Sequence, residues 1–504
     1  MSSNDCGNRG FVASQTLAGS LHVRRTDWST LGNALARTLV ALSAVIAAVM
    51  FASAPHAARK SGPQQYVAPG GSGALFLLNG HGWGHGVGMG QWGAQGYAQQ
   101  GYTYEQILAA YYPGTTLGQT TETSIRVLLA DGKKTLTISS KKPIDVEDGD
   151  GADHTLPAGT TTLTPQLELA VDGGPAQALT PPLTFSPAAG TTLTLGRRYR
   201  GQIVIDVPDQ KLRAINVLPL EQYLYGVVPA EMPSAWLPAA LDAQAVAARS
   251  YALASRQAGA PFDVYADGRS QAYLGASAET AAGRQAVDET ADEVLLYGGD
   301  VADTLFSSST GGWTQSAADA FGAPGRPYLV SVRDPYDTIS PYHDWGPVVV
   351  TGKTLGRALG VKGRIVDATV RRNSSRRVKT LQLTALQRGT KQASAAAGAD
   401  VASALGLRST WFSVGVLSLR PPSPNRAVAP GTRVRLSGVV RGVRGVVVQS
   451  RTTGEPWRRF RSIPRRARAF HFAVKPKVTT DYRLAISGDA AAFVRIRVEA
   501  ATVK

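Results

Sequence analysis

One carboxylate flanked by two prolines is the residue of this chain best suited by its neighbours to acid–base chemistry. Residues 228–233 are Val-Pro-Ala-Glu-Met-Pro, so Glu231 lies between Pro229 and Pro233. Each proline fixes its own φ at about −65° and disfavours the α conformation of the residue before it, which predicts a stiffened, extended turn. Apolar neighbours would desolvate the carboxyl group, favour its protonated form and suit it to act as a general acid. The alternative is a surface glutamate that caps the next helix.

A glycine-rich segment carries two further polar candidates, His81 and His85. Their spacing of four would pair two metal ligands on one face of a helix. Glycines at 82, 84, 86 and 88 argue against a helix, and no glutamate of the HExxH type lies between the histidines. The one cysteine, Cys6, lies near the N-terminus, so the body has no thiolate ligand for zinc. We expect no metal and no cofactor. The glycines would let backbone approach a ligand closely, with His85 hydrogen-bonding at the cleft or, alternatively, buried as a structural histidine.

Three helices are expected to hold these residues. Short helices are predicted over 91–100 and 104–111, the second opened by a capping-box pair, Thr103 and Gln106. A long helix is predicted over the alanine-rich segment 239–258, soon after the carboxylate.

The remaining patterns predict an α+β protein with two β-rich parts. Alternating apolar and polar residues with frequent turns indicate an antiparallel β domain over about 124–216, inserted into a body that spans 74–420. Residues 421–504 show strands and turns over a length that suits a small Ig-like β-sandwich.

The N-terminal 60 residues are typical of an export signal. Basic residues precede an apolar run over 39–54, which is shorter than the ~20 residues of a membrane span. A small-residue cleavage motif ends that run, but Pro55 follows it directly and would hinder cleavage. We therefore expect a secreted protein or, alternatively, one held by an N-terminal membrane anchor. A polar Pro/Gly linker follows over 61–73.

The positive charge of the chain is concentrated in its last part. The net charge is +17, and residues 421–504 contain 18 Lys and Arg against 4 Asp and Glu. Such clustering predicts an anionic partner for this part. The export signal favours an anionic wall polymer and argues against nucleic acid. The alternative is a basic surface that is only solvated.

Five ordered segments together resemble the sporulation stage II protein D family, also called the amidase-enhancer or SpoIID/LytB family. They are residues 84–94, 216–224, 226–233, 243–252 and 306–312. The resemblance covers roughly residues 75–415 and implies a SpoIID-like body that acts on peptidoglycan.

The resemblance implies that the chain is a lytic transglycosylase that cleaves glycan strands, preferably strands without stem peptides. The family's catalytic glutamate aligns with Glu231. One carboxylate suffices for this reaction, since the muramoyl 6-hydroxyl attacks C1 in place of water. The alternative is a non-catalytic peptidoglycan-binding protein that enhances a separate cell-wall amidase. Serine hydrolysis is not expected, since no nucleophile elbow surrounds Ser307 and Ser308.

The remaining candidates are predicted to bind substrate. Arg249 belongs to the site in the family pattern, but an interhelical salt bridge is the alternative. The other substrate-binding candidates are His85, Gln91, Gln271, Tyr273, Ser307, Ser308 and Gly311. One departure from the family affects this set: the Gly-His-Gly motif follows the catalytic glutamate in the sporulation proteins, whereas His85 precedes Glu231 by 146 residues. The site keeps its form only if the two ends of the body lie together.

Overall fold

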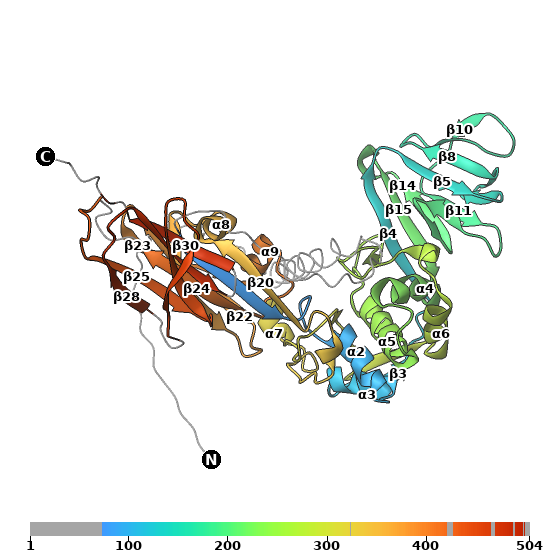
Figure 1. The fold of residues 1–504 in the computed structure, drawn as a ribbon. Coiled ribbons are helices and arrows are strands. Elements are labelled where there is room, and N and C mark those ends of the chain that lie inside the picture. Colours follow the sequence, from blue (N-terminus) through green and yellow to red (C-terminus); the bar gives the residue numbers. More distant parts are fainter. Residues whose placement is uncertain are drawn as a thin grey trace, which may run out of the picture.

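The structure is a computed structural model that describes residues 73–322, 324–420, 427–464, 469–486, 489–496 and 498. The predicted export signal and most of the predicted linker lie outside these residues. No helix within the described ranges is long and apolar enough to cross a membrane. The chain forms an extended array, with a β domain at one end, helices in the middle and the C-terminal sheets at the other end (Figure 1).

The first elements lead from the C-terminal sheets into the helical middle part. Strand β1 (Leu75–His81) is followed by β2 (Met89–Gly90), α2 (Gln91–Gln99), α3 (Tyr104–Tyr111) and β3 (Thr116–Gln119). Both short helices were predicted, and the capping box is present: Thr103 Oγ1 accepts from Gln106 N–H, and Gln106 Oε1 accepts from Thr103 N–H.

The inserted β domain follows and contains antiparallel strands, as predicted. Its elements are β4 (Ser124–Lys133), β5 (Leu136–Ser140), β6 (Ile144–Glu147), β7 (Asp153–Leu156), β8 (Gly159–Leu163), β9 (Glu168–Ala170), β10 (Ala176–Ala178), β11 (Leu183–Pro187), β12 (Leu193–Leu195), β13 (Arg197–Tyr199), β14 (Gln202–Asp206) and β15 (Leu212–Pro219). Strands β7, β6, β11, β14, β15 and β4 lie in one sheet, which β16 (Val264–Tyr265) extends in parallel beside β4. Strand β15 leads directly into the helix that carries Glu231.

The middle part is built around a buried helix. Its elements are α4 (Leu220–Glu231), α5 (Pro238–Ala254), α6 (Ala281–Glu289), β17 (Glu293–Tyr297), β18 (Asp300–Val301), β19 (Phe306–Ser307) and α7 (Ala317–Phe321). Every residue of α5 from Ala240 to Ala252 is buried. The small alanine side chains explain this position, because α2, α3, α4 and α6 can all pack closely against them.

The C-terminal elements form two sheets that share a core and a third, three-stranded sheet. They are β20 (Asp344–Thr351), α8 (Gly352–Ala358), β21 (Arg364–Arg372), β22 (Val378–Gln387), β23 (Thr390–Ala397), α9 (Gly398–Leu405), β24 (Phe412–Arg420), β25 (Val434–Arg441), β26 (Val446–Thr452), β27 (Arg458–Ser462), β28 (Ala469–Val474), β29 (Thr480–Ile486) and β30 (Asp489–Ile496). One core sheet has the order β20-β1-β24-β25-β28 and the other β27-β26-β29-β30.

The α+β class is confirmed, whereas the Ig-like sandwich over 421–504 stays a prediction. Strand β25 pairs with β24, and β28 pairs with β25, so both extend a sheet of the body. Leu75 of β1 packs in the same core as Leu436 and Phe472. Residues before 421 therefore complete the core of the C-terminal part.

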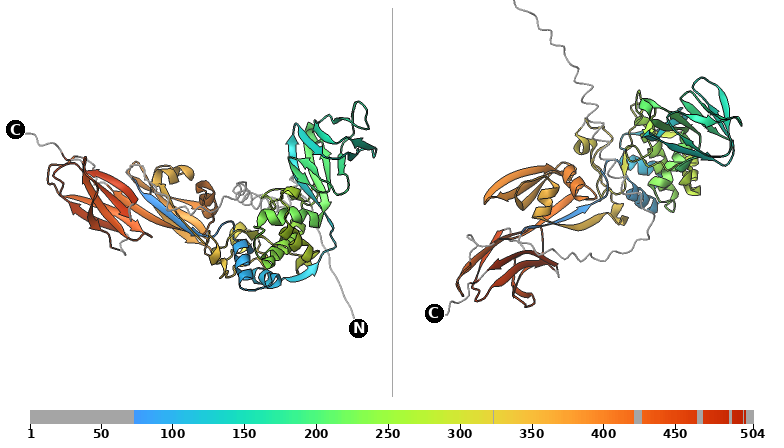
Figure 2. Two further views of the ribbon diagram at one scale, coloured as in Figure 1. Left: turned by 45° about the vertical axis from the view of Figure 1, so that its right-hand side comes forward. Right: turned by 90° about the horizontal axis from the view of Figure 1, so that it is seen from above.

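Strand β1 brings the two ends of the body together. It pairs antiparallel with β24, from Leu75 opposite Leu417 to Gly80 opposite Phe412. The other edge of β1 pairs with β20. Figure 2 shows this blue strand among the orange strands in both views. The permuted glycine-rich segment therefore starts beside the end of the body, as the sequence requires for an intact site.

Candidate functional site

Glu231 is the last residue of helix α4 and does not lie on an extended turn. Pro229 occupies the helix interior, because its fixed φ is compatible with a helix. The predicted effect of Pro233 is present: Met232, which precedes it, is extended with φ −124° and ψ 144°. The second proline thus ends the helix directly after the carboxylate. The extended turn predicted for residues 228–233 is wrong up to Glu231, which is helical, and correct at Met232, which is extended.

Two groups from distant segments hold the carboxyl group of Glu231. The backbone N–H of Ala272 donates to Oε1 at 2.7 Å. The side-chain amide of Gln91 donates to Oε2 at 3.4 Å. Oε1 is therefore firmly bound, whereas Oε2 has only one long contact.

The environment of Glu231 favours its protonated form. The residue remains partly exposed, but protein surrounds its carboxyl group, and this burial raises the pKa. The hydrogen bonds from Ala272 and Gln91 act in the opposite direction and are the smaller effect. An acid of this kind can hold a proton until a substrate oxygen takes it.

Gln91 links the glycine-rich segment to this carboxylate. It begins helix α2 directly after β2, which pairs in parallel with β19. Its Nε2 also donates to Oε1 of Gln244 on α5, at 3.4 Å. The permuted segment therefore reaches the Glu231 carboxyl group through Gln91.

Several groups of this region were not predicted from the sequence. Gln244 is fully buried, and its Nε2 has no hydrogen-bond partner within the described chain. The sequence did hold a signal for Gln244, because a single amide side chain among alanines of a helix is unusual. The rings of Trp92 and Trp236 meet edge to face at 4.8 Å. Trp92 is adjacent to Gln91, and Trp236 lies five residues after Glu231. No sequence signal indicated the backbone N–H of Ala272.

His85 is partly exposed, but protein surrounds its imidazole, which fits the structural alternative that its sequence left open. Its Nδ1 accepts from the backbone N–H of Val87 at 3.0 Å. Burial lowers the pKa of His85 to about 4, while a hydrogen bond with the Phe306 backbone acts in the opposite direction. The imidazole is therefore neutral at pH 7, and both of its nitrogens are occupied by the protein itself.

Ser307, Ser308 and Gly311 hold the glycine-rich segment in place. Ser307 Oγ accepts from Gly86 N–H at 3.2 Å, and the Ser308 carbonyl accepts from Trp92 N–H at 3.0 Å. Gly311 has φ +73°, and a Cβ there would lie 2.6 Å from the Cβ of His81. Only glycine fits so close an approach. The contacts of these three residues with the segment are thus structural.

Arg249 forms an interhelical salt bridge, which is the alternative that its sequence left open. This corrects its assignment as a substrate-binding residue. The side chain is fully buried, and its Nε donates to Glu221 Oε1 at 2.8 Å. Other guanidinium N–H groups donate to the carbonyls of Glu293 and Val287. The guanidinium is therefore committed to fixing α5 against the first turn of α4.

Tyr273 and Gln271 are also buried, which corrects their assignment to a sugar-binding surface. Tyr273 is 1% exposed, and its hydroxyl donates to Asn216 Oδ1 at 2.7 Å. Gln271 is 2% exposed, and its Nε2 donates to the Tyr223 hydroxyl and the Ala248 carbonyl. These bonds fix the irregular segment that presents the Ala272 N–H to Glu231.

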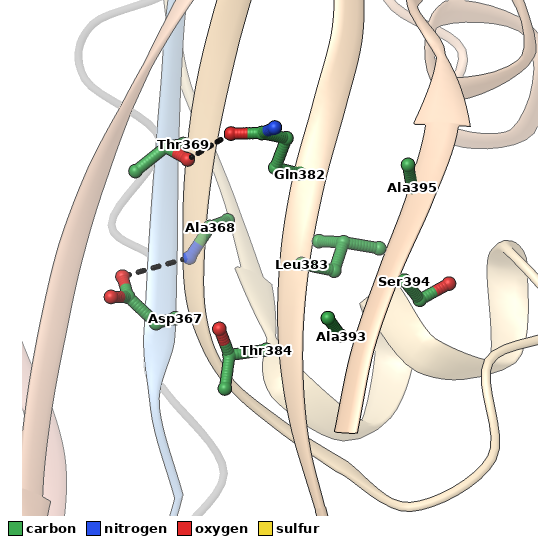
Figure 3. A pocket seen from close by; sticks show the side chains of 9 residues that line it. All are labelled: Asp367, Ala368, Thr369, Gln382, Leu383, Thr384, Ala393, Ser394 and Ala395. Carbon is green, nitrogen blue, oxygen red and sulfur yellow. Dashed lines mark hydrogen bonds between the residues drawn. The ribbon is translucent and has the colours of Figure 1, made fainter. Parts of the chain in front are cut away.

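A separate hollow of about 530 Å³ lies on the three-stranded sheet β21–β22–β23. Figure 3 shows its lining of threonine, glutamine, serine and alanine side chains. Its one carboxylate, Asp367, is engaged by Arg441. The hollow thus offers no free acid and is not the candidate active site. Within the described ranges, no group of three or more His, Cys, Asp or Glu side chains is arranged to hold a metal.

Comparison with known proteins finds a family match over part of the chain. The profile of the Stage II sporulation protein (SpoIID) family matches residues 208–297, which include Glu231, Gln244 and Ala272. The chain is 35% identical to an uncharacterised protein of Brachyspira hyodysenteriae over 213 residues, which are 41% of this chain and 57% of that protein.

Two named relatives are Bacillus subtilis proteins. Stage II sporulation protein D is 33% identical over 170 residues, which are 30% of this chain and 48% of that protein. The amidase enhancer is 35% identical over 118 residues, which are 23% of this chain and 15% of that protein. The chain thus spans about half the length of the first two relatives, and no solved structure matches it. The chain contains a domain of the stage II sporulation protein D family.

Proposed function

We propose that this protein is an exported lytic transglycosylase that cleaves peptidoglycan glycan strands, with Glu231 as its single acid and base. The observation that carries the proposal is the state of that carboxyl group. It is desolvated enough to have a raised pKa, and one of its oxygens has only a single long contact, 3.4 Å from Gln91. This is the arrangement that general acid catalysis requires.

In this proposal the two carboxyl oxygens have different tasks. Oε1 accepts the Ala272 N–H, so Oε2 carries the proton. Oε2 gives this proton to the glycosidic oxygen between N-acetylmuramic acid and N-acetylglucosamine, and the bond from that oxygen to C1 breaks. The carboxylate then takes the proton of the muramoyl 6-hydroxyl, whose oxygen bonds to C1 and closes a 1,6-anhydro ring. The carboxyl group ends protonated, ready for another cycle.

Two partly exposed aromatic side chains are suited to hold the glycan. The Trp92–Trp236 pair offers apolar ring surface to pyranose faces. Gln91 would keep Glu231 oriented between cycles.

The same proposal places the protein outside the cytoplasm, in the cell wall. It rests on the predicted export signal and on relatives that include a sporulation protein and an amidase enhancer. A cell-wall amidase is the partner suggested by the second name, since an amidase supplies strands without stem peptides.

Product analysis tests the enzymatic function. Purified protein incubated with denuded glycan strands should release fragments that end in 1,6-anhydro-muramic acid, detected by mass spectrometry. Glu231→Gln keeps the shape of the side chain but removes the proton, so the rate should fall by about 10²–10⁴-fold. Glu168→Gln, an exposed position on β9, is the matched control and should keep full activity.

Two outcomes would overturn the proposal. If the wild-type protein releases no anhydro ends yet stimulates a purified amidase, it is an enhancer and not an enzyme. If Glu231→Gln cleaves as fast as Glu168→Gln while both unfold at the wild-type temperature, the acid lies elsewhere.

A further inference from the structure

We propose that the outer face of the sheet β27–β26–β29–β30 binds a polymer of phosphodiester-linked units, as a wall anchor separate from the Glu231 site. This face is defined here as the arginine face and consists of Arg451, Arg459, Arg483, Arg495, Trp457, Gln449 and Asp481. The sheet that carries β30 lies at one end of the molecule, away from α4 in the helical middle part (Figure 1).

Strand register places the members of the arginine face on one side of the sheet. Gln449 and Arg451 are two residues apart on β26, so they point to the same side. Their partners on β29 are Arg483 and Asp481. Asp481 in turn pairs with Arg495 on β30, and Gln449 pairs with Arg459 on β27. Val448, which alternates with them, is fully buried, so this side faces away from the core.

The face carries four arginines and a single carboxylate, which two of the arginines share. Arg495 Nε donates to Asp481 Oδ1 at 2.7 Å, and Arg451 Nε donates to Oδ2 at 3.3 Å. Arg483 Nε donates to the neutral Gln449 Oε1 at 2.8 Å. Within the described ranges, no carboxylate lies at ion-pair distance from Arg483. The face thus has a net charge of about +3 that the protein does not neutralise.

Trp457 holds two of these arginines close together. The guanidinium carbons of Arg451 and Arg483 lie 4.5 and 4.1 Å from the centroid of its ring. Two cations held on one indole repel each other: burial lowers the pKa of Arg483, and the charge of Arg451 lowers it further. A phosphate between the two arginines would relieve that repulsion and accept hydrogen bonds from both guanidinium groups.

The arrangement favours a phosphodiester polymer without bases. Guanidinium groups bind phosphate through paired N–H donors, and several in a row suit a repeating anion. Single-stranded nucleic acid is held by aromatic rings on which bases stack. The ring of Trp457 is instead covered by arginine side chains of the protein. The arginine face therefore suits the phosphate groups and offers no specific contacts to the units between them.

Binding of the full-length protein to poly(glycerol phosphate) tests this site. The double variant Arg451→Gln/Arg483→Gln should weaken binding at least ten-fold at about 50 mM salt. This salt concentration is chosen because it screens charges only weakly. The slope of log K against log salt should fall by about 1.4, as expected for two lost phosphate contacts on a flexible polyanion. The matched control is Arg433→Gln/Arg435→Gln, which removes the same charge from exposed positions near and on β25.

Further comparisons separate this site from its alternatives. Polygalacturonate, a carboxylate polymer, and single-stranded DNA should both bind more weakly than poly(glycerol phosphate) at equal charge. Equal weakening by both double variants would overturn the proposal in favour of a diffuse charge effect. Tighter binding of DNA, or equal binding of polygalacturonate, would also overturn it. Glu231→Gln should bind the polymer like the wild type, so failure of glycan cleavage and failure of this site are distinguishable. Thermal unfolding of each variant shows whether it remains folded.

Discussion

Substitution of Gln91 by glutamate would place a second carboxyl group against Glu231. The Gln91 amide lies 3.4 Å from Glu231 Oε2, and glutamate has nearly the same shape. At this distance, two negative charges repel by about 5 kcal/mol with an effective dielectric constant of about 20. Since one pKa unit corresponds to about 1.4 kcal/mol, the pair should keep one shared proton to a pH about three and a half units higher.

Two measurements report this shift. Release of anhydro ends should extend to higher pH, because the acid of the pair remains protonated there, and the alkaline limb of the pH–rate profile should move up by about three and a half units. The free energy of unfolding should also fall more steeply with rising pH than in the wild type, because the folded state binds a proton that the unfolded state has lost. The second measurement does not depend on enzymatic activity.

Gln95→Glu is the matched control, one turn later on α2. Gln95 Oε1 accepts from the backbone N–H of Leu237 at 3.0 Å, a bond that a glutamate carboxylate can also accept. Its pH profile should resemble that of the wild type. If Gln91→Glu shows neither the shifted limb nor the steeper fall in stability, Gln91 does not contact Glu231 in solution, and the link from the glycine-rich segment to the acid is refuted.

Three further predictions concern the supporting structure. Arg249→Ala leaves Glu221 unpaired and should lower the free energy of unfolding by about 3–5 kcal/mol in urea titrations, and a loss below about 1 kcal/mol would contradict the buried ion pair. Burial and the nearby Asp337 raise the pKa of Asp334 to about 7, so the free energy of unfolding of the wild type should fall by up to about 4 kcal/mol as pH rises from about 4 through 7. Asp334→Asn should remove that fall, and an unchanged pH profile of the variant would contradict the raised pKa. Because burial lowers the pKa of His85 to about 4, its ring signals in NMR spectra should not titrate between pH 5 and 8, and a midpoint near 6.5 would contradict the buried state.

Local patterns in the sequence predicted most of the fold. The capping box at Thr103 and Gln106, the alternating strands after residue 124 and the alanine-rich α5 all involve neighbours in sequence. The shared sheet of the C-terminal part was not predictable in this way. It depends on pairing between β1 and β24, more than 300 residues apart, for which neither strand carries a local signal.

The candidate site was predictable in part. Glu231 and Gln91 were identified from their motifs, and the structure brings them together. Arg249 and Tyr273 carry groups that suit ligand binding, but tertiary partners occupy them: Glu221 for the arginine and Asn216 for the tyrosine. The Ala272 contact comes from a backbone N–H, which every residue except proline possesses, so residue type gave no indication of it.

The pairing of β1 with β24 makes the folded body larger than the part that matches the family. The family match covers residues 208–297, whereas the body runs from β1 to β24. A fragment limited to 208–297 contains Glu231, Gln244 and Ala272 but lacks Gln91 and the strand that anchors its segment. Loss of the last strand of the body would leave the first one paired only with β20, and would weaken the support of the segment whose amide contacts the acid. An insertion or truncation near residue 415 would thus act on the Glu231 carboxyl group from more than 180 residues away in sequence. The natural unit for expression or for exchange between relatives is therefore the whole body, from the first strand to the last.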